Sequence, residues 1–259
     1  MGHIIAVTNY KGGVGKTTST INIAAHLAKK KNKVLVIDLD PQANLSHGFG
    51  IDDDLEKNVY TIFRGEYTVK DSIITKSKID IVPSTLDLSV ADAEFNTRTM
   101  REFMLKKILA PVKDDYDFIL IDCPPNLALL TINAIVAADF YVIPLQAEFF
   151  ALKGLAKLVN AVKMIKDETQ SNIELAGIFL TRFNQRKTLS KDVLSFVQES
   201  MGDKIYECYV RENVAIAEAQ SMGISIFDYD KQTEKVSNGA EDYRELTEEI
   251  LKKIKKVIS

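Results

Sequence analysis

A glycine-rich segment near the N-terminus limits the folds open to this chain. Residues 11–18 read KGGVGKTT; an apolar run from Ile4 to Val7 precedes them, and an apolar pattern at helical spacing from Thr17 to Lys30 follows. In the order strand, loop, helix, the backbone N–H groups of the loop and the positive end of the helix face the same point. The segment therefore predicts a strand–loop–helix unit that binds phosphate, and an unliganded glycine turn is the alternative.

The loop fits most of the pattern G-x-x-x-x-G-K-[ST]. Lys16 and Thr17 fill its last positions, whereas Tyr10 stands where its first glycine would be. We expect the Lys16 ammonium to lie against the β- and γ-phosphates of a nucleotide and Thr17 Oγ1 to bind Mg²⁺. The predicted nucleotide-binding residues of the loop are Gly12, Gly13, Val14, Gly15, Lys16, Thr17 and Thr18.

Apolar runs alternate with helical patterns along the rest of the chain. This alternation predicts an α/β fold with a mainly parallel twisted sheet and helices on both faces. With the glycine loop, the expected class is a P-loop NTPase. With 259 residues, 46% hydrophobic content and no Pro/Gly/Ser-rich linker, we expect one domain over residues 1–259. Residues 52–75 favour surface helices or loops. The further expected strands are 34–37, 79–82, 118–121, 141–144 and 176–180.

Carboxylates follow two of these strands. Asp38 and Asp40 follow the second, and their alternate spacing lets both approach one metal ion or one water. Asp122 ends a later apolar run, as does the Walker B carboxylate that serves Mg²⁺. For Asp38 and Asp40, starting a turn at Pro41 is the alternative.

Lys11 lies five residues before Lys16 and has no role inside a cradle that Lys16 already occupies. The segment K-G-G-x-G-K-[ST] resembles the deviant Walker A motif of the ParA/MinD family, a SIMIBI class of P-loop ATPases. D-x-D-P-Q at 38–42 and D-x-P-P at 122–125 resemble its two switch segments. Residues 143–154 resemble the partition ATPases of the ParA/Soj type more than MinD.

This resemblance implies ATP and Mg²⁺ as cofactors and an ATP-dependent homodimer. It implies that Lys11 reaches the phosphates bound by the facing subunit, although an exposed loop charge would look the same. It implies that Asp40 positions or activates the attacking water, and that Asp38 organises the metal shell. Lys11, Lys16 and Asp40 are thus the expected catalytic residues, and Thr17, Asp38 and Asp122 the expected metal-site residues.

Adenine and DNA contacts follow from the same resemblance. Asn184, after the strand 176–180, is the candidate for adenine, and Arg211 belongs to the segment 210–216 that completes the pocket. Glu212 and Ala215 stand where Soj/ParA-type relatives carry arginines that touch DNA. The remaining candidates for nonspecific DNA contacts are Arg182, Arg186, Lys187 and Arg211, for which ordinary solvated charge is the alternative.

Composition excludes several classes. A net charge of −3 gives no global attraction to nucleic acid, so DNA binding requires a local patch. Cys123 and Cys208 lack the spacing of a zinc site or a disulfide framework, which fits a reducing cytoplasm. No apolar run approaches the roughly 20 residues that span a bilayer. The basic amphipathic pattern of 243–259 fits either lipid binding or core packing; we expect core packing and no membrane partner.

Together these features predict a partition ATPase that is cytoplasmic and nucleoid-associated. The resemblance implies slow ATP hydrolysis stimulated by a ParB-like centromere-binding protein, and loose binding of the ATP dimer to nonspecific DNA. One alternative is a MinD-like positioning ATPase that cycles on membranes. A less favoured one is a reductase like the nitrogenase iron protein, which needs two cysteines per subunit at a dimer axis.

Overall fold

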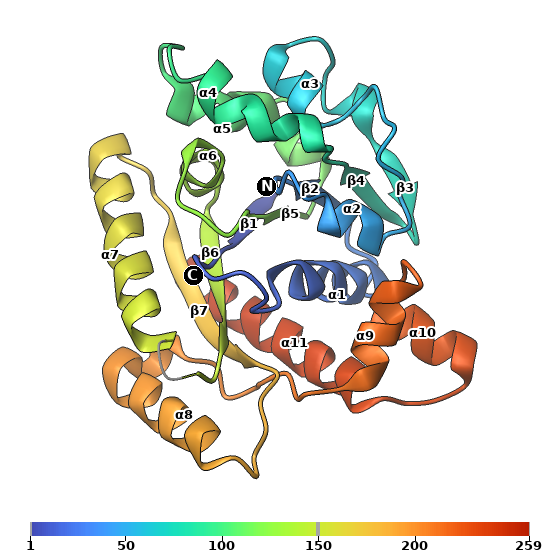
Figure 1. Ribbon diagram of the computed structural model, residues 1–259, viewed down its shortest axis with the longest axis vertical. Helices are drawn as coiled ribbons and strands as arrows, with labels where there is room; N and C mark the ends of the chain where they lie inside the picture. Colours follow the sequence, from blue (N-terminus) through green and yellow to red (C-terminus); the bar gives the residue numbers. More distant parts are fainter. Residues whose placement is uncertain (1, 149–150, 259) are drawn as a thin grey trace.

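One mixed sheet organises the molecule. The computed structural model describes residues 2–148 and 151–258, and its strands follow the order β3-β4-β2-β5-β1-β6-β7 (Figure 1). All neighbouring pairs are parallel except β3 and β4. The strands are β1 (His3–Val7), β2 (Val34–Asp38), β3 (Ile74–Lys76), β4 (Ile79–Val82), β5 (Phe118–Asp122), β6 (Phe140–Gln146) and β7 (Glu174–Thr181).

Helices cover both faces of the sheet (Figure 1). On one face lie α3 (Val59–Arg64), α4 (Ala91–Glu94), α5 (Met104–Leu109), α6 (Leu129–Ala137), α7 (Ala151–Thr169) and α8 (Thr188–Met201). The other face carries α1 (Lys16–Lys29), α2 (Asn44–Gly48), α9 (Val214–Ser221), α10 (Ile226–Thr233) and α11 (Asn238–Ile258). The predicted fold class is confirmed.

The strands supply two hydrophobic cores because successive side chains point to opposite faces. Along β1, Ile4 and Ala6 belong to the core under α5–α8, whereas Ile5 and Val7 belong to the core under α1 and α11. This continuous burial produces the apolar runs that predicted the strands. The structure adds β3, a mostly exposed edge strand of three residues that is too short and polar to give such a run.

The C-terminal helix α11 packs its apolar side into the core. Leu246, Ile250 and Ile254 are buried on the face of the sheet that also carries α1. The amphipathic pattern of residues 243–259, which fits either lipid binding or core packing, is therefore explained by core packing. Within residues 2–148 and 151–258, no helix has the length and apolar character needed to cross a bilayer.

The central strands bring their carboxyl ends together. Asp122 at the end of β5 is in register with Val7 at the end of β1 and with Asp38 at the end of β2. The glycine loop leaves β1 at this edge and leads directly into α1. Residues from three chain segments therefore meet where open α/β sheets bind ligands.

Candidate nucleotide site

The loop between β1 and α1 leaves room for a ligand. Gly13 and Gly15 have φ angles of +73° and +88°, in the left-handed region where glycine avoids the steric cost of a Cβ. Among the residues that the structure describes, a Cβ built at Gly13 would meet no atom within 4 Å, and one at Gly12 would meet only Pro125 Cβ, at 3.9 Å. No side-chain hydrogen bond caps the start of α1 at Gly15. The first N–H groups of the helix can therefore serve an anion.

Lys16 lies back over this loop. Its Nζ donates to the carbonyl oxygen of Lys11 at 3.1 Å, and the residue is 6% exposed. Burial lowers the pKa of this ammonium, while the nearby Asp122 carboxylate raises it. A buried ammonium with a backbone carbonyl as partner is stabilised further by a phosphate oxygen. The loop and Lys16 thus fit a phosphate group.

Thr181, at the end of the edge strand β7, anchors the loop. Its Oγ1 donates to the carbonyl oxygen of Val14 at 2.7 Å, and its side chain lies 3.5 Å from a Cβ built at Gly15. No sequence motif singled out Thr181. Its position at the end of β7 was the available signal, because that strand end also lies at the carboxyl edge.

Asp122 is fully buried beside the start of α1. Its Oδ2 accepts a hydrogen bond from Thr17 Oγ1 at 2.6 Å, and its Oδ1 accepts one from Thr20 Oγ1 at 3.3 Å. Burial, and then the Asp38 carboxylate, raise the pKa of Asp122 to about 8. A divalent cation beside this pair would offset both causes. The oxygen donors Thr17 and Asp122 therefore fit Mg²⁺, which prefers such ligands.

These residues do not form a metal cage on their own. Among the residues that the structure describes, no group of three or more His, Cys, Asp or Glu side chains could hold a metal ion. Mg²⁺ usually keeps several waters and binds one or two protein oxygens together with phosphates. The donor set therefore fits a nucleotide-bound Mg²⁺.

Asp38 and Asp40 have different surroundings. Asp38 is completely buried; it accepts hydrogen bonds from Ser46 and from the Asp40 N–H, and burial raises its pKa to about 6. Asp40 is 7% exposed, and its Oδ1 accepts from the Gln42 N–H at 3.0 Å. Asp40 thus lies on the short connection after β2, close enough to Lys16 to raise the pKa of that lysine.

Lys11 occupies an exposed position on the loop, about half accessible to solvent. Its ammonium forms an ion pair with Glu148, which lies after β6. Its backbone N–H donates to Asn9 Oδ1 at 3.1 Å, and Asn9 Nδ2 donates to the carbonyl oxygen of Pro144 at 2.7 Å. The loop is therefore tied to the segment 143–154, of which residues 149 and 150 lie outside the described part.

Comparison with known proteins identifies the family. The family model described as an AAA domain matches residues 2–175. The chain is 42% identical over 253 residues to the sporulation initiation inhibitor protein Soj of Bacillus subtilis, covering 96% of this chain and 98% of Soj. The chromosome-partitioning ATPase Soj of Treponema pallidum is also 42% identical over 253 residues, with 97% and 98% covered. The chain belongs to the ParA/MinD family of P-loop ATPases.

A solved structure shares the fold over the same length. Cobyrinic acid a,c-diamide synthase from Mycobacterium smegmatis, with a bound ATP analogue and magnesium, matches with a TM-score of 0.84 and 30% identity. The match covers 98% of this chain and 96% of that one. The deviant Walker A loop and both switch segments of this ParA/MinD ATPase therefore lie in a fold known to hold a nucleotide with magnesium.

The predicted adenine residues lie beyond β7. Asn184 Oδ1 accepts a hydrogen bond from the Arg186 N–H at 3.0 Å. Arg211 is held by α11 instead: its guanidinium donates to the buried Asp242 carboxylate at 2.5–3.1 Å and to Glu241 at 3.0 Å. Arg211 thus fastens the segment between α8 and α9 to α11, and its charge is already compensated.

The candidate DNA residues share one carboxylate. Arg182 and Lys187 lie 3.7 and 3.8 Å from Glu212, and all three side chains are about half exposed or more. The structure brings Arg182, Arg186 and Lys187 together on the connection between β7 and α8 and places Arg211 next to Glu212. Glu212 therefore lowers the positive charge of this surface.

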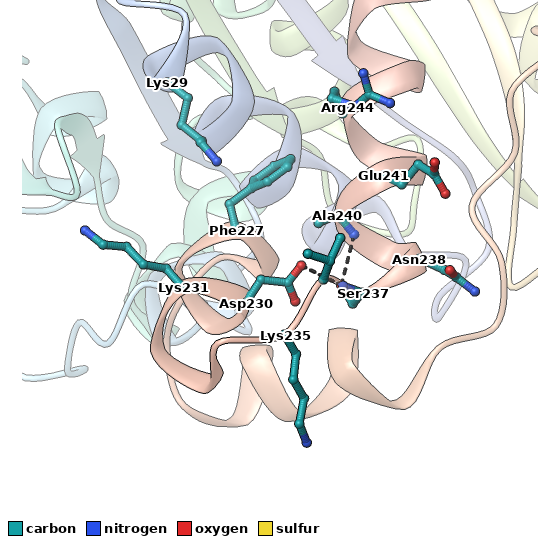
Figure 2. A pocket seen from close by; sticks show the side chains of 11 residues that line it. Lys29, Phe227, Asp230, Lys231, Lys235, Ser237, Asn238, Ala240, Glu241 and Arg244 are labelled. Atoms are coloured by element: carbon teal, nitrogen blue, oxygen red, sulfur yellow. Dashed lines mark hydrogen bonds between the residues drawn. The ribbon is translucent and has the colours of Figure 1, made fainter.

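A hollow of about 470 Å³ lies away from the loop, between the end of α1, α10 and the start of α11 (Figure 2). Its lining has mixed charge, with Lys29, Lys231, Lys235 and Arg244 beside the carboxylates of Asp230 and Glu241. Lys29 and Lys16 lie at opposite ends of α1. We therefore place the phosphate site at the glycine loop and not in this hollow.

Proposed function

We propose that this protein is an ATP-dependent dimerising switch of the partition type, with residues 1–259 acting as one ATPase domain. The observation that carries the proposal is the pair of loop lysines. Lys16 is buried against the loop, whereas Lys11 is about half exposed and pairs with Glu148 instead of with the loop. A second lysine held outside its own cradle fits a role at the phosphates of another subunit.

The residues present fit ATP with Mg²⁺. The loop N–H groups and Lys16 would hold the β- and γ-phosphates, Thr17 would bind the metal and Asp122 would support it. Mg²⁺ supplies charge neutralisation of the phosphate oxygens. Asp40 would orient the attacking water, and Lys11 of the facing subunit would stabilise developing charge. Hydrolysis would be slow until a ParB-like centromere-binding protein engages the dimer.

We propose that the dimer binds DNA without sequence preference through Arg182, Arg186 and Lys187. Two copies of a small cationic surface are enough for weak, salt-sensitive contacts to phosphates. Such binding would place the ATP form on the nucleoid and release the ADP form to the cytoplasm.

Two other functions fit the structure less well. A membrane-cycling role would need an apolar helix face free for lipid, whereas that of α11 packs into the core. A shared iron–sulfur cluster would need accessible cysteines, whereas Cys123 is completely buried.

The deciding experiment measures binding to nonspecific duplex DNA with ADP, with ATP, and with ATP plus Asp40→Ala, at two salt concentrations. We expect binding that needs ATP, persists in the variant and weakens with salt. Lys11→Ala should abolish ATP-dependent dimerisation and DNA binding together. ATP-dependent dimers that do not bind DNA at either salt concentration would contradict the partition role.

A further inference from the structure

A buried set of hydrogen bonds closes the segment between β2 and α2. Asp38 Oδ2 accepts from the backbone N–H of Ser46 at 2.9 Å and from its hydroxyl at 2.7 Å. Asp38 Oδ1 accepts from the Asp40 N–H at 3.1 Å. Ser46 Oγ also accepts from the N–H of Ser84, just after β4, at 3.0 Å. Because Asp38, Ser46 and Ser84 are at most 1% exposed, this network is shielded from water.

The network encloses the stretch that carries Asp40. The Ala43 N–H donates to the Asp40 carbonyl oxygen at 2.9 Å, and Ala43 itself has φ +51°, a conformation that L-residues rarely adopt. Such a residue persists only where its surroundings determine the backbone. Asp38 lies before the turn and Ser46 after it. Their hydrogen bonds hold the two ends of the turn together and so fix its backbone.

We propose that Asp38 and Ser46 are positioning residues that fix the backbone under Asp40, with Asp38 acting through the Asp40 N–H instead of through the metal shell. Both oxygens of Asp38 already accept hydrogen bonds from the chain itself. The Ser84 N–H links this arrangement to the end of β4, so the sheet holds the turn in place. The inference rests on the proposed role of Asp40 in hydrolysis.

Steady-state ATP hydrolysis by the full-length Ser46→Ala variant tests the proposal. We expect kcat to fall roughly ten- to hundredfold, because a displacement of about 1 Å at a catalytic group has an effect of that size. The KM for ATP and the Mg²⁺ concentration for half-maximal rate should stay the same, since Ser46 touches neither site. Ser46→Thr, which restores a hydroxyl, should recover part of kcat.

Thr85→Val is the matched control. Thr85 is buried beside Ser84, and within the described residues its Oγ1 has no hydrogen-bond partner. The substitution removes a buried hydroxyl of the same neighbourhood without touching the network. Its kcat should therefore equal that of the wild type, and an equal loss in both variants would overturn the proposal.

Asp38→Asn gives a second test that does not depend on how Ser46→Ala folds. It keeps the shape of the side chain, but an amide cannot accept from all three donors. We expect a lower kcat at saturating Mg²⁺, whereas a normal kcat with a higher Mg²⁺ requirement would place Asp38 in the metal shell and overturn the inference.

Active Asp40→Ala would refute the proposed role of Asp40 itself. Inactive Asp40→Ala beside fully active Ser46→Ala and Asp38→Asn would refute the positioning network alone.

Discussion

Burial sets the charge state of the carboxylates at the edge of the sheet. Asp122 is enclosed with Asp38 as a neighbour, and its pKa is raised to about 8, far above the ordinary value of 3.8. The ligand-free protein thus carries a carboxyl group whose ionisation the fold opposes. Mg²⁺ bound with a nucleotide would favour that ionisation. The buried carboxyl therefore suits ligand binding, although it destabilises the ligand-free fold.

Asp122→Asn should make the ligand-free protein more stable at pH 8. Between about pH 4 and pH 8 the folded wild type keeps a proton that the unfolded chain has released, so its stability falls as pH rises. In the variant, residue 122 binds no such proton, so its contribution to the slope of stability against pH is absent. A difference of about 1 kcal/mol corresponds to roughly 2–4 °C in melting temperature for a chain of this size. Thermal melts at pH 5 and pH 8 check the prediction, which equal pH slopes in the two proteins would contradict.

Glu148→Gln should strengthen ATP-dependent dimerisation. The exposed Lys11–Glu148 pair contributes little to folding but must open before Lys11 can serve another subunit. Removing it is expected to tighten the dimer by roughly two- to fivefold, the equivalent of about 0.5–1 kcal/mol. Sedimentation of the non-hydrolysing Asp40→Ala protein with ATP gives the measurement.

Glu174→Gln is the control, because it opens an exposed pair with Lys166 away from the loop. A weaker dimer in Glu148→Gln would show that Glu148 itself takes part in the interface.

At the scale of elements, β7 depends on close packing against the segment that follows α8. A Cβ built at Gly177 would lie 2.4 Å from Tyr206 Cζ, and Tyr206 is almost completely buried. The Tyr206 N–H donates to the Ile178 carbonyl oxygen at 2.7 Å, so the ring cannot move without loosening the strand edge. Because Thr181 and Asn184 lie at the end of β7, this contact also helps to fix the site.

Gly177→Ala should lower the melting temperature by several degrees, because overpacking of a core typically costs about 1–3 kcal/mol. Gly154→Ala in α7 is the matched control: a Cβ there meets no atom of the described residues within 4 Å, and alanine favours a helix. The expected order of melting temperature is Gly154→Ala at or above the wild type, with Gly177→Ala below both. Equal melting temperatures for the two variants would show that Tyr206 adapts freely.

At the scale of the whole molecule, the distribution of charge decides whether DNA binds. The chain has a net charge of −3, and its candidate cationic surface includes Glu212 between Arg182 and Lys187. Arg211, another of the four candidates, is committed to Asp242 and Glu241. The proposed DNA binding would therefore depend on a few side chains that a single carboxylate partly neutralises.

Glu212→Gln should tighten nonspecific DNA binding by the ATP form. Freeing Arg182 and Lys187 adds phosphate contacts, and each contact steepens the slope of log affinity against log salt by about 0.9. Fluorescence anisotropy on a duplex over a salt series measures both quantities. Glu66→Gln, which opens the exposed pair with Arg64 at the end of α3, should leave them unchanged. An unaltered affinity in Glu212→Gln would move the DNA surface elsewhere.

The local pattern alone determined the fold class and the centre of the site. Strands buried on both faces require continuous apolar runs, and a phosphate loop requires glycines and a lysine at fixed spacing. Both features can therefore be recognised in short segments of the sequence. The alignment of Asp38 and Asp122 follows as well, because the carboxyl ends of parallel strands share one edge.

Only the tertiary structure decided which partners these residues have. The hydrogen bond from Thr181 to Val14 and the Lys11–Glu148 pair join residues 167 and 137 positions apart, and no local pattern encodes such contacts. The same holds for the hydrogen bond from Ser84 N–H to Ser46 Oγ and for the contact of the Arg211 guanidinium with Asp242. Sequence spacing places a side chain on an element, whereas packing of distant elements determines what that side chain can still bind.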